Sequence, residues 1–71
     1  MPEEPSPGDQ WGLTPAEAEV WRMLAEHRSD TEIAEIRVVS IWTVKSQVRS
    51  ILRKLEVRTR REAARLYQKS L

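Results

Sequence analysis

Three motifs of the form Ser/Thr-x-x-Glu are spread along this 71-residue chain, and each is typical of the start of an α-helix. They run from Thr14 to Glu17, from Ser29 to Glu32 and from Thr59 to Glu62. In such a motif the hydroxyl accepts a hydrogen bond from the backbone N–H three residues on, and the carboxylate accepts one from the backbone N–H of the first residue. No segment shows the alternation of apolar and polar residues that is typical of a β-strand. The sequence therefore predicts an all-α fold.

The longest predicted helix lies in residues 40–55, SIWTVKSQVRSILRKL, with Ser40 as its cap. At 3.6 residues per turn its apolar positions form one stripe, made of Val44, Val48, Ile51 and Leu55. The opposite face contains no acidic residue and carries Trp42, Lys45, Ser46, Arg49 and Arg53. A helix of this kind, about 22 Å long, suits the major groove of B-DNA, with its apolar side buried and its basic side on the nucleic acid.

Four helices are expected in all, near residues 15–27, 30–37, 41–55 and 60–69. Their apolar positions predict one core, made of Val20, Leu24, Ile33, Ala34, Val44, Val48, Ile51 and Leu55. Ile36 and part of Trp21 are expected to face inward as well, and His27 is expected in the last turn of the first helix. Residues 1–10 hold three of the four prolines and are expected to form a disordered arm ahead of a domain that spans residues 11–71.

The net charge is +1 for the whole chain, but it differs sharply between the two halves. Residues 1–36 contain two cations and nine acids, a net charge of −7, whereas residues 37–71 contain ten cations and two acids, a net charge of +8. Such an asymmetry indicates a polyanionic partner for the C-terminal half. A basic surface that contacts only solvent is the alternative, and the gathering of cations on one helix face favours the polyanion.

Residues that perform catalysis or bind metals are scarce. The chain has no cysteine and one histidine, so neither a disulfide framework nor a zinc site is available to it. It has no glycine-rich phosphate loop and no Ser/His/acid set, and the pair Glu32 and Glu35 is interpreted as a solvated face. We therefore expect no enzyme activity, no cofactor and no metal. No stretch reaches the roughly 18 apolar residues of a membrane span, and the acidic, proline-rich N-terminus is unlike a targeting signal, so the expected location is the cytoplasm.

Three segments carry a resemblance to a known family: LTPAEAEVWRMLAE, TEIAE and TVKSQVRSILRKLEVRTRREAA. In this order, over residues 13–71, they resemble the DNA-binding domain of LuxR/FixJ-type (GerE-type) bacterial transcription regulators. The resemblance implies a four-helix bundle in which the second and third helices form a helix-turn-helix and the third is the recognition helix. It also implies a response-regulator output domain that dimerises through its fourth helix.

The resemblance assigns candidate contacts residue by residue. Base edges are expected to meet Lys45, Ser46 and Arg49, and Lys45 and Arg49 are favoured because their long donors reach guanine O6 and N7. The resemblance places Thr31, Thr43 and Lys54 near the DNA backbone, and Trp42 and Arg53, on the basic side of the central helix, are expected to contact the backbone as well. The dimer interface is expected to use Arg61, Ala64, Arg65 and Gln68, because the small residues of the last helix leave room for another helix.

Two departures from the family pattern bear on this prediction. Glycine is usual where this chain has His27, Val38 and Glu56. A β-branched residue at a left-handed position costs about 1–2 kcal/mol, so either the turn at Val38 has another geometry or stability is lost there. Ile41-Trp42 replaces what is often a Pro-Asn pair. Two interpretations of Trp42 remain open: packing against the second helix, or contact with a sugar, a phosphate or a thymine methyl group.

Three functions remain open from the sequence. The first is a sequence-specific DNA-binding transcription regulator whose partners are double-stranded DNA, a second copy of the chain and RNA polymerase. The second is a sigma-factor-like promoter-recognition domain, and the third is a helix-turn-helix-derived protein-interaction module with weakened DNA binding. A membrane partner is disfavoured because the core needs the apolar stripe of the central helix. The chain fits both a stand-alone regulator and the output domain of a longer one, and its operator and its effect on transcription stay open.

Overall fold

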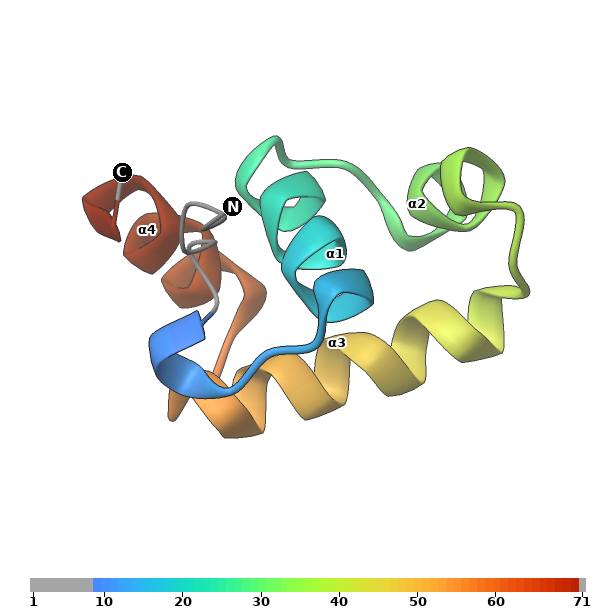
Figure 1. Ribbon diagram of the computed structural model, residues 1–71. Helices are drawn as coiled ribbons and strands as arrows, with labels where there is room; N and C mark the ends of the chain where they lie inside the picture. The colour runs from blue at the N-terminus through green and yellow to red at the C-terminus, as the bar shows by residue number, and fades with distance from the viewer. Residues whose placement is uncertain (1–8, 71) are drawn as a thin grey trace, which may run out of the picture.

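Four α-helices make up the computed structural model, which describes residues 9–70 (Figure 1). They are α1 (Pro15–Ala25), α2 (Asp30–Arg37), α3 (Ile41–Leu55) and α4 (Arg60–Ser70), and a short 3-10 helix, η1 (Asp9–Trp11), precedes them. No strand occurs in this part of the chain. The predicted all-α fold is therefore confirmed, and α2 and α3 form the helix-turn-helix.

The predicted arm over residues 1–10 lies outside the described residues, except for its last two. Asp9 and Gln10 belong to η1, so helical structure begins before residue 11, the predicted start of the domain. Trp11 and Leu13 then fold back onto the helices: Leu13 is buried, and Trp11 packs against the core.

The helix starts follow the capping motifs of the sequence. At α1 the Thr14 hydroxyl accepts a hydrogen bond from the Glu17 N–H (3.1 Å), and the Glu17 carboxylate accepts one from the Thr14 N–H (2.9 Å). The same pair of bonds joins Ser29 and Glu32 at α2. At α4 only half of the predicted motif forms. The Thr59 hydroxyl accepts from the Glu62 N–H, but the Glu62 carboxylate accepts from the N–H of Arg58, in the α3–α4 link, rather than from that of Thr59.

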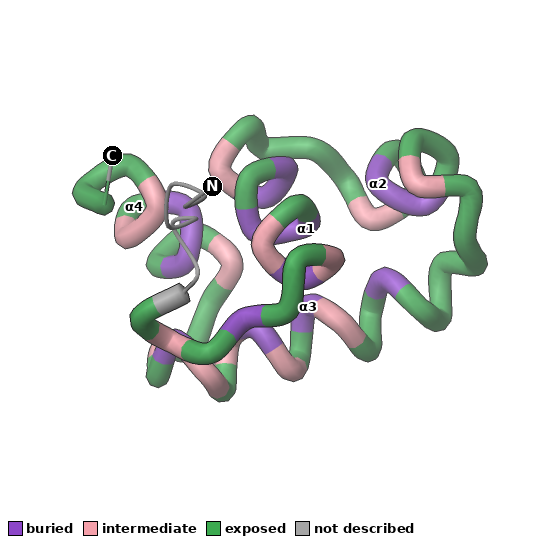
Figure 2. Tube along the Cα trace, in the orientation of Figure 1, coloured by how far each residue is buried: buried purple, intermediate pink, exposed green. Residues whose placement is uncertain are grey.

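The core lies where the other helices cover one side of α3 (Figure 2). All eight residues predicted for it are buried: Val20, Leu24, Ile33, Ala34, Val44, Val48, Ile51 and Leu55. Ile36 does not join them, contrary to expectation, and is 49% exposed. The reason is that the short helix α2 packs mainly against α3 and buries only Ile33 and Ala34 there.

Trp21 is the largest side chain of the core, and it is wholly rather than partly buried. Its indole N–H donates to the carbonyl oxygen of Ala63 in α4 (2.8 Å). Its ring lies edge-on between Trp11 and Tyr67, with centroids 5.2 and 5.0 Å away. This aromatic cluster joins the start of the described chain, α1 and α4. The indole of Trp21 can be fully buried because its N–H has a hydrogen-bond acceptor in Ala63.

A residue in the left-handed region follows within two residues of the end of α1, α2 and α3: His27 (φ 61°), Val38 (φ 55°) and Glu56 (φ 58°). After each of them the next N–H turns back to a carbonyl of the helix, as Val39 does to Ala34 (3.0 Å). This is the Schellman geometry that glycine favours, so the chain keeps the left-handed turn at Val38 without having a glycine. It also explains why α1 ends at Ala25, which leaves His27 outside the helix rather than in its last turn.

We expect the substitution Val38→Gly to raise the free energy of unfolding by about 1 kcal/mol. Val38 is β-branched, is 88% exposed and has the left-handed conformation, so glycine removes the Cβ strain while little packing is lost. The larger entropy of the unfolded glycine chain offsets part of the gain. Urea denaturation measures the difference. Val39→Gly is the matched control: Val39 is the neighbouring valine and has no left-handed backbone, so its replacement is expected to lower stability.

Candidate nucleic-acid interface

One face of α3 is cationic and open to solvent, and we call it the cationic face. It consists of Trp42, Lys45, Ser46, Arg49 and Arg53, all of which are exposed. Its orientation is fixed by the opposite side of the helix, where Val44, Val48, Ile51 and Leu55 are buried. Since no acidic residue lies in α3, the cations of this face are not neutralised from within their own helix. The structure thus brings together the three predicted base-contacting residues with Trp42 and Arg53.

Trp42 lies at the N-terminal end of the cationic face and is 76% exposed. The interpretation in which it packs against the second helix is therefore wrong. The Nζ atom of Lys45 lies over the indole, 5.8 Å from the ring centroid, which is a cation–π contact. The two residues are one helical turn apart, so this contact is local to the first two turns of α3.

The two threonines predicted to meet the DNA backbone lie near helix starts. Thr31 is exposed in the first turn of α2. Thr43 is exposed in the first turn of α3, where its N–H donates to the capping hydroxyl of Ser40 (3.1 Å). Both hydroxyl groups are within the helix-turn-helix, and their contact with phosphate stays a prediction.

Lys54 is held by the scaffold on the flank of α3 that faces α1. Its Nζ lies 2.7 Å from the Glu17 carboxylate and 3.3 Å from the carbonyl oxygen of Gly12. The other Glu17 oxygen accepts a hydrogen bond from the Ser50 hydroxyl (2.7 Å). Any phosphate contact by Lys54, which was predicted from the sequence, has to compete with this ion pair.

Glu17 is the residue whose role the sequence did not reveal beyond its capping motif. It is the only buried charged residue in the described part of the chain, at 7% exposed. Burial by itself raises the pKa of Glu17, but hydrogen bonds from Lys54, Thr14 and Ser50, with the charge of Lys54, lower it from 4.5 to about 2. Glu17 therefore stays ionised and fixes the start of α1 against the C-terminal half of α3. The signal that the sequence does contain is the spacing of Ser50 and Lys54, one turn apart on one flank of the central helix.

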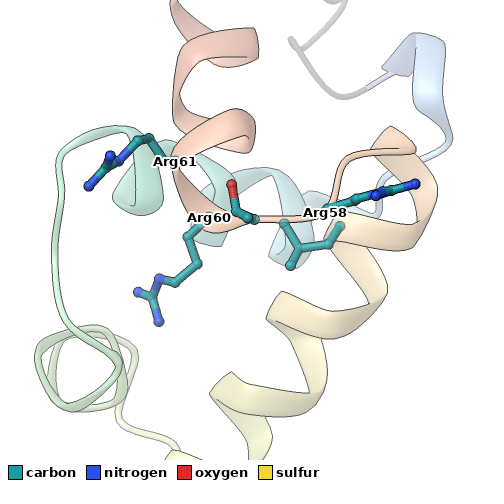
Figure 3. A pocket seen from close by; sticks show the side chains of 5 residues that line it. Arg58, Arg60 and Arg61 are labelled. Carbon is teal, nitrogen blue, oxygen red and sulfur yellow. The ribbon is translucent and has the colours of Figure 1, made fainter.

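A second basic region surrounds the start of α4 (Figure 3). An open hollow is lined there by Leu52, Arg58, Thr59, Arg60 and Arg61. Arg60 forms an ion pair with Asp30 and donates to the carbonyl oxygen of Arg28 (3.0 Å), so it ties α4 to the start of α2. Figure 3 shows that the side chain of Arg58 points away from those of Arg60 and Arg61. The guanidinium group of Arg58 therefore does not converge with those of Arg60 and Arg61 on one point of the hollow.

The residues predicted for the dimer interface do not all reach the surface. Arg61, Arg65 and Gln68 are exposed on α4 at a spacing of one helical turn or two. Ala64, by contrast, is 4% exposed, and its neighbour Ala63 accepts the Trp21 hydrogen bond. The small side chains let α1 approach α4 within one chain, so Ala64 offers no surface to a second copy.

Other kinds of site are not formed by the described residues. Among residues 9–70, no three His, Cys, Asp or Glu side chains are grouped so that they could hold a metal ion. None of the described helices has the length and the apolar character needed to cross a membrane. The cationic face of α3 and the exposed apolar residues near the start of this helix are the surface features that suit contact with a binding partner.

Comparison with protein families gave a match over most of the chain. Residues 12–67 match the family described as bacterial regulatory proteins, luxR family (GerE), which covers most of the chain. Comparisons with curated proteins and with solved structures gave no match. The matched residues include all of α1, α2 and α3 and most of α4.

Proposed function

Because the chain belongs to the luxR family of bacterial regulatory proteins, whose domain is a DNA-binding helix-turn-helix of transcription regulators, we propose that it binds DNA sequence-specifically through α3. In this proposal α3 lies in the major groove. The protein regulates transcription in the cytoplasm, and RNA polymerase is a further partner. The family is one of DNA-binding regulatory domains rather than of enzymes.

The observation that carries the proposal is the cationic face of α3. Lys45, Arg49 and Arg53 are exposed on it, and its helix contains no acid to oppose the phosphates. The major groove, about 12 Å wide, admits one α-helix. The N-terminal half of α3 enters first in our proposal, since the C-terminal half is flanked by the Glu17–Lys54 ion pair and by the start of α4.

In this arrangement one set of residues contacts the bases and another contacts the phosphates. Lys45, Ser46 and Arg49 face base edges, and the two long cations donate to acceptors of guanine. Thr31, Thr43 and Arg53 contact phosphates. Lys54 also contacts a phosphate if its ion pair with Glu17 breaks and a phosphate takes the place of the carboxylate. Phosphate contacts set the register of the protein on the duplex, whereas base contacts select the sequence.

We also propose that two copies bind together, through the exposed stripe of Arg61, Arg65 and Gln68 on α4. Three polar side chains make a weak interface alone, so the dimer forms mainly on DNA, where two half-sites bring the copies together. A two-fold symmetric dimer requires a palindromic site. Selection of bound duplexes from a random library at moderate salt tests function and symmetry at once.

We expect Lys45→Ala or Arg49→Ala to weaken binding to the selected duplex by about 1–3 kcal/mol and to change binding to a scrambled duplex little. Each variant removes a long donor to a base, and the scrambled sequence offers no matched acceptor. Titrations of both duplexes at several salt concentrations measure the two losses and separate them from a general loss of charge.

Lys69→Ala is the matched control for these variants. Lys69 is an exposed cation near the end of α4, away from the cationic face, so its removal is expected to leave both affinities nearly unchanged. Equal losses on the selected and the scrambled duplex would contradict the proposed base contacts and make Lys45 and Arg49 phosphate contacts.

A protein-interaction module is the second candidate function, and one observation favours it. The large apolar residues that are exposed in the described chain all lie within residues 36–42, at the end of α2, in the turn and at the start of α3. Contiguous apolar surface marks interaction sites. Under this candidate the random-duplex selection yields no preferred sequence.

A further inference from the structure

The exposed large apolar residues of the described chain all lie in one segment, residues 36–42. They are Ile36, Val38, Val39, Ile41 and Trp42. The segment includes the end of α2, the turn and the first residues of α3. Only Trp42 among them belongs to the cationic face, because it precedes Lys45 by three residues and Arg49 by seven. The cationic face therefore presents one large apolar side chain among its cations.

Trp42 is in contact with a cation of the same face, Lys45. Lys45 Nζ lies 5.8 Å from the centroid of the indole ring and covers one of its faces, while 76% of the residue remains exposed. A contact of this kind at an exposed site contributes about 0.5–1 kcal/mol, and it leaves the rest of the ring open to solvent. The aromatic surface is therefore presented to whatever α3 binds, next to the two favoured base-contacting cations.

Burial of an apolar side chain is most favourable against another apolar group. A phosphate offers the indole one hydrogen bond, to its N–H, and no apolar surface. In the major groove the apolar group on the base edges is the C5-methyl group of thymine. We propose that Trp42 packs against a thymine methyl group and so makes the protein select thymine at the position that faces the first turn of α3. This inference rests on the proposed function, and it selects the thymine methyl group from the three DNA contacts (sugar, phosphate or thymine methyl) that the sequence left open for Trp42.

A cycle of substitutions in protein and DNA tests the contact. Each thymine of the selected duplex is replaced in turn by deoxyuridine, which removes only the methyl group. At one thymine in each half-site we expect this replacement to lower the affinity about fourfold. This is the change in affinity that corresponds to about 0.8 kcal/mol, the contribution of one buried methyl group. Trp42→Ala is expected to weaken binding to the thymine duplex about tenfold and to abolish the effect of deoxyuridine at that position. Loss of that effect shows that the two groups touch.

Two controls accompany the cycle. Ile36→Ala removes an exposed apolar side chain that lies outside the cationic face, and it is expected to change neither the affinity nor the deoxyuridine effect. Thermal unfolding of Trp42→Ala is expected to stay close to that of the unmodified protein because the side chain is mostly exposed. A change in affinity therefore reports contact with DNA.

The outcomes separate this inference from the proposed function. If Trp42→Ala weakens thymine and deoxyuridine duplexes equally, Trp42 contacts the DNA backbone and the inference is wrong. If it changes neither, the apolar segment serves a protein partner, which also overturns the inference. A selected site without thymine in its half-sites has the same consequence. Failure of the unmodified protein to select any duplex overturns the proposed function itself.

Discussion

The substitution Val48→Asp is expected to abolish the cooperative unfolding transition of this domain. Val48 is 8% exposed in the single core that all four helices share, where an aspartate carboxylate has no cation to pair with on the buried stripe of α3. Burying an unpaired charge costs several kcal/mol, and a domain of this size has only about 5 kcal/mol to lose. Circular dichroism during heating measures the transition.

A matched variant separates burial from charge. Ser46→Asp adds the same carboxylate to α3 two residues away, on the exposed cationic face, where Lys45 and Arg49 are near in sequence. It is expected to keep a cooperative transition close to that of the unmodified protein. A transition of normal midpoint in Val48→Asp would contradict the helix orientation on which the cationic face depends.

The stability of the protein is expected to fall as the pH decreases from about 5 to about 2, by about 3 kcal/mol through Glu17 alone. The pKa of Glu17 is lowered in the folded protein from 4.5 to about 2, mainly because the hydrogen bonds and charge of its partners outweigh the effect of burial. Between these two pKa values the unfolded chain binds more protons than the folded one. The stabilising contribution of Glu17 is therefore complete above the unfolded pKa, and it is lost as the pH falls through the folded pKa. One pKa unit corresponds to about 1.4 kcal/mol.

Glu17→Gln isolates this contribution. At pH 7 the variant is expected to be less stable by about 2–3 kcal/mol, since Lys54 and Ser50 lose the charged acceptor that they share. Near pH 2 the two proteins are expected to be about equally stable. Urea denaturation across this pH range gives both values. Glu35→Gln, at an exposed glutamate of α2, is the control and is expected to have nearly the stability of the unmodified protein at pH 7.

A constant difference between Glu17→Gln and the unmodified protein from pH 7 to pH 2 would contradict the lowered pKa. It would mean that the amide disturbs packing rather than charge.

The same variant bears on function, because the Glu17–Lys54 pair fixes α1 against α3. Loss of the pair frees Lys54, so salt-dependent binding to scrambled duplexes is expected to strengthen slightly.

The sequence by itself determined the features that depend on residues within one or two helical turns. Capping pairs such as Thr14 and Glu17 act across three residues, so their hydrogen bonds are read directly from the chain. The apolar stripe of Val44 and Val48 follows from the period of the helix, and it fixed which side of α3 is cationic before any packing was known. The left-handed turn at Val38 does not follow from the sequence in the same way, because a valine there is compatible either with the backbone that glycine prefers or with another turn geometry.

Only the tertiary structure decided the contacts between helices. Glu17 pairs with Lys54 across 37 residues, and the Trp21 indole donates to Ala63 across 42. Ala64 is buried by its own chain, while Ile36 and Trp42 remain exposed. Helical periodicity tells which side of a helix is apolar, but not how far a neighbouring helix extends over it or which polar group it brings near. Those depend on the crossing and offset of packed helices, which the whole set of side-chain contacts determines together.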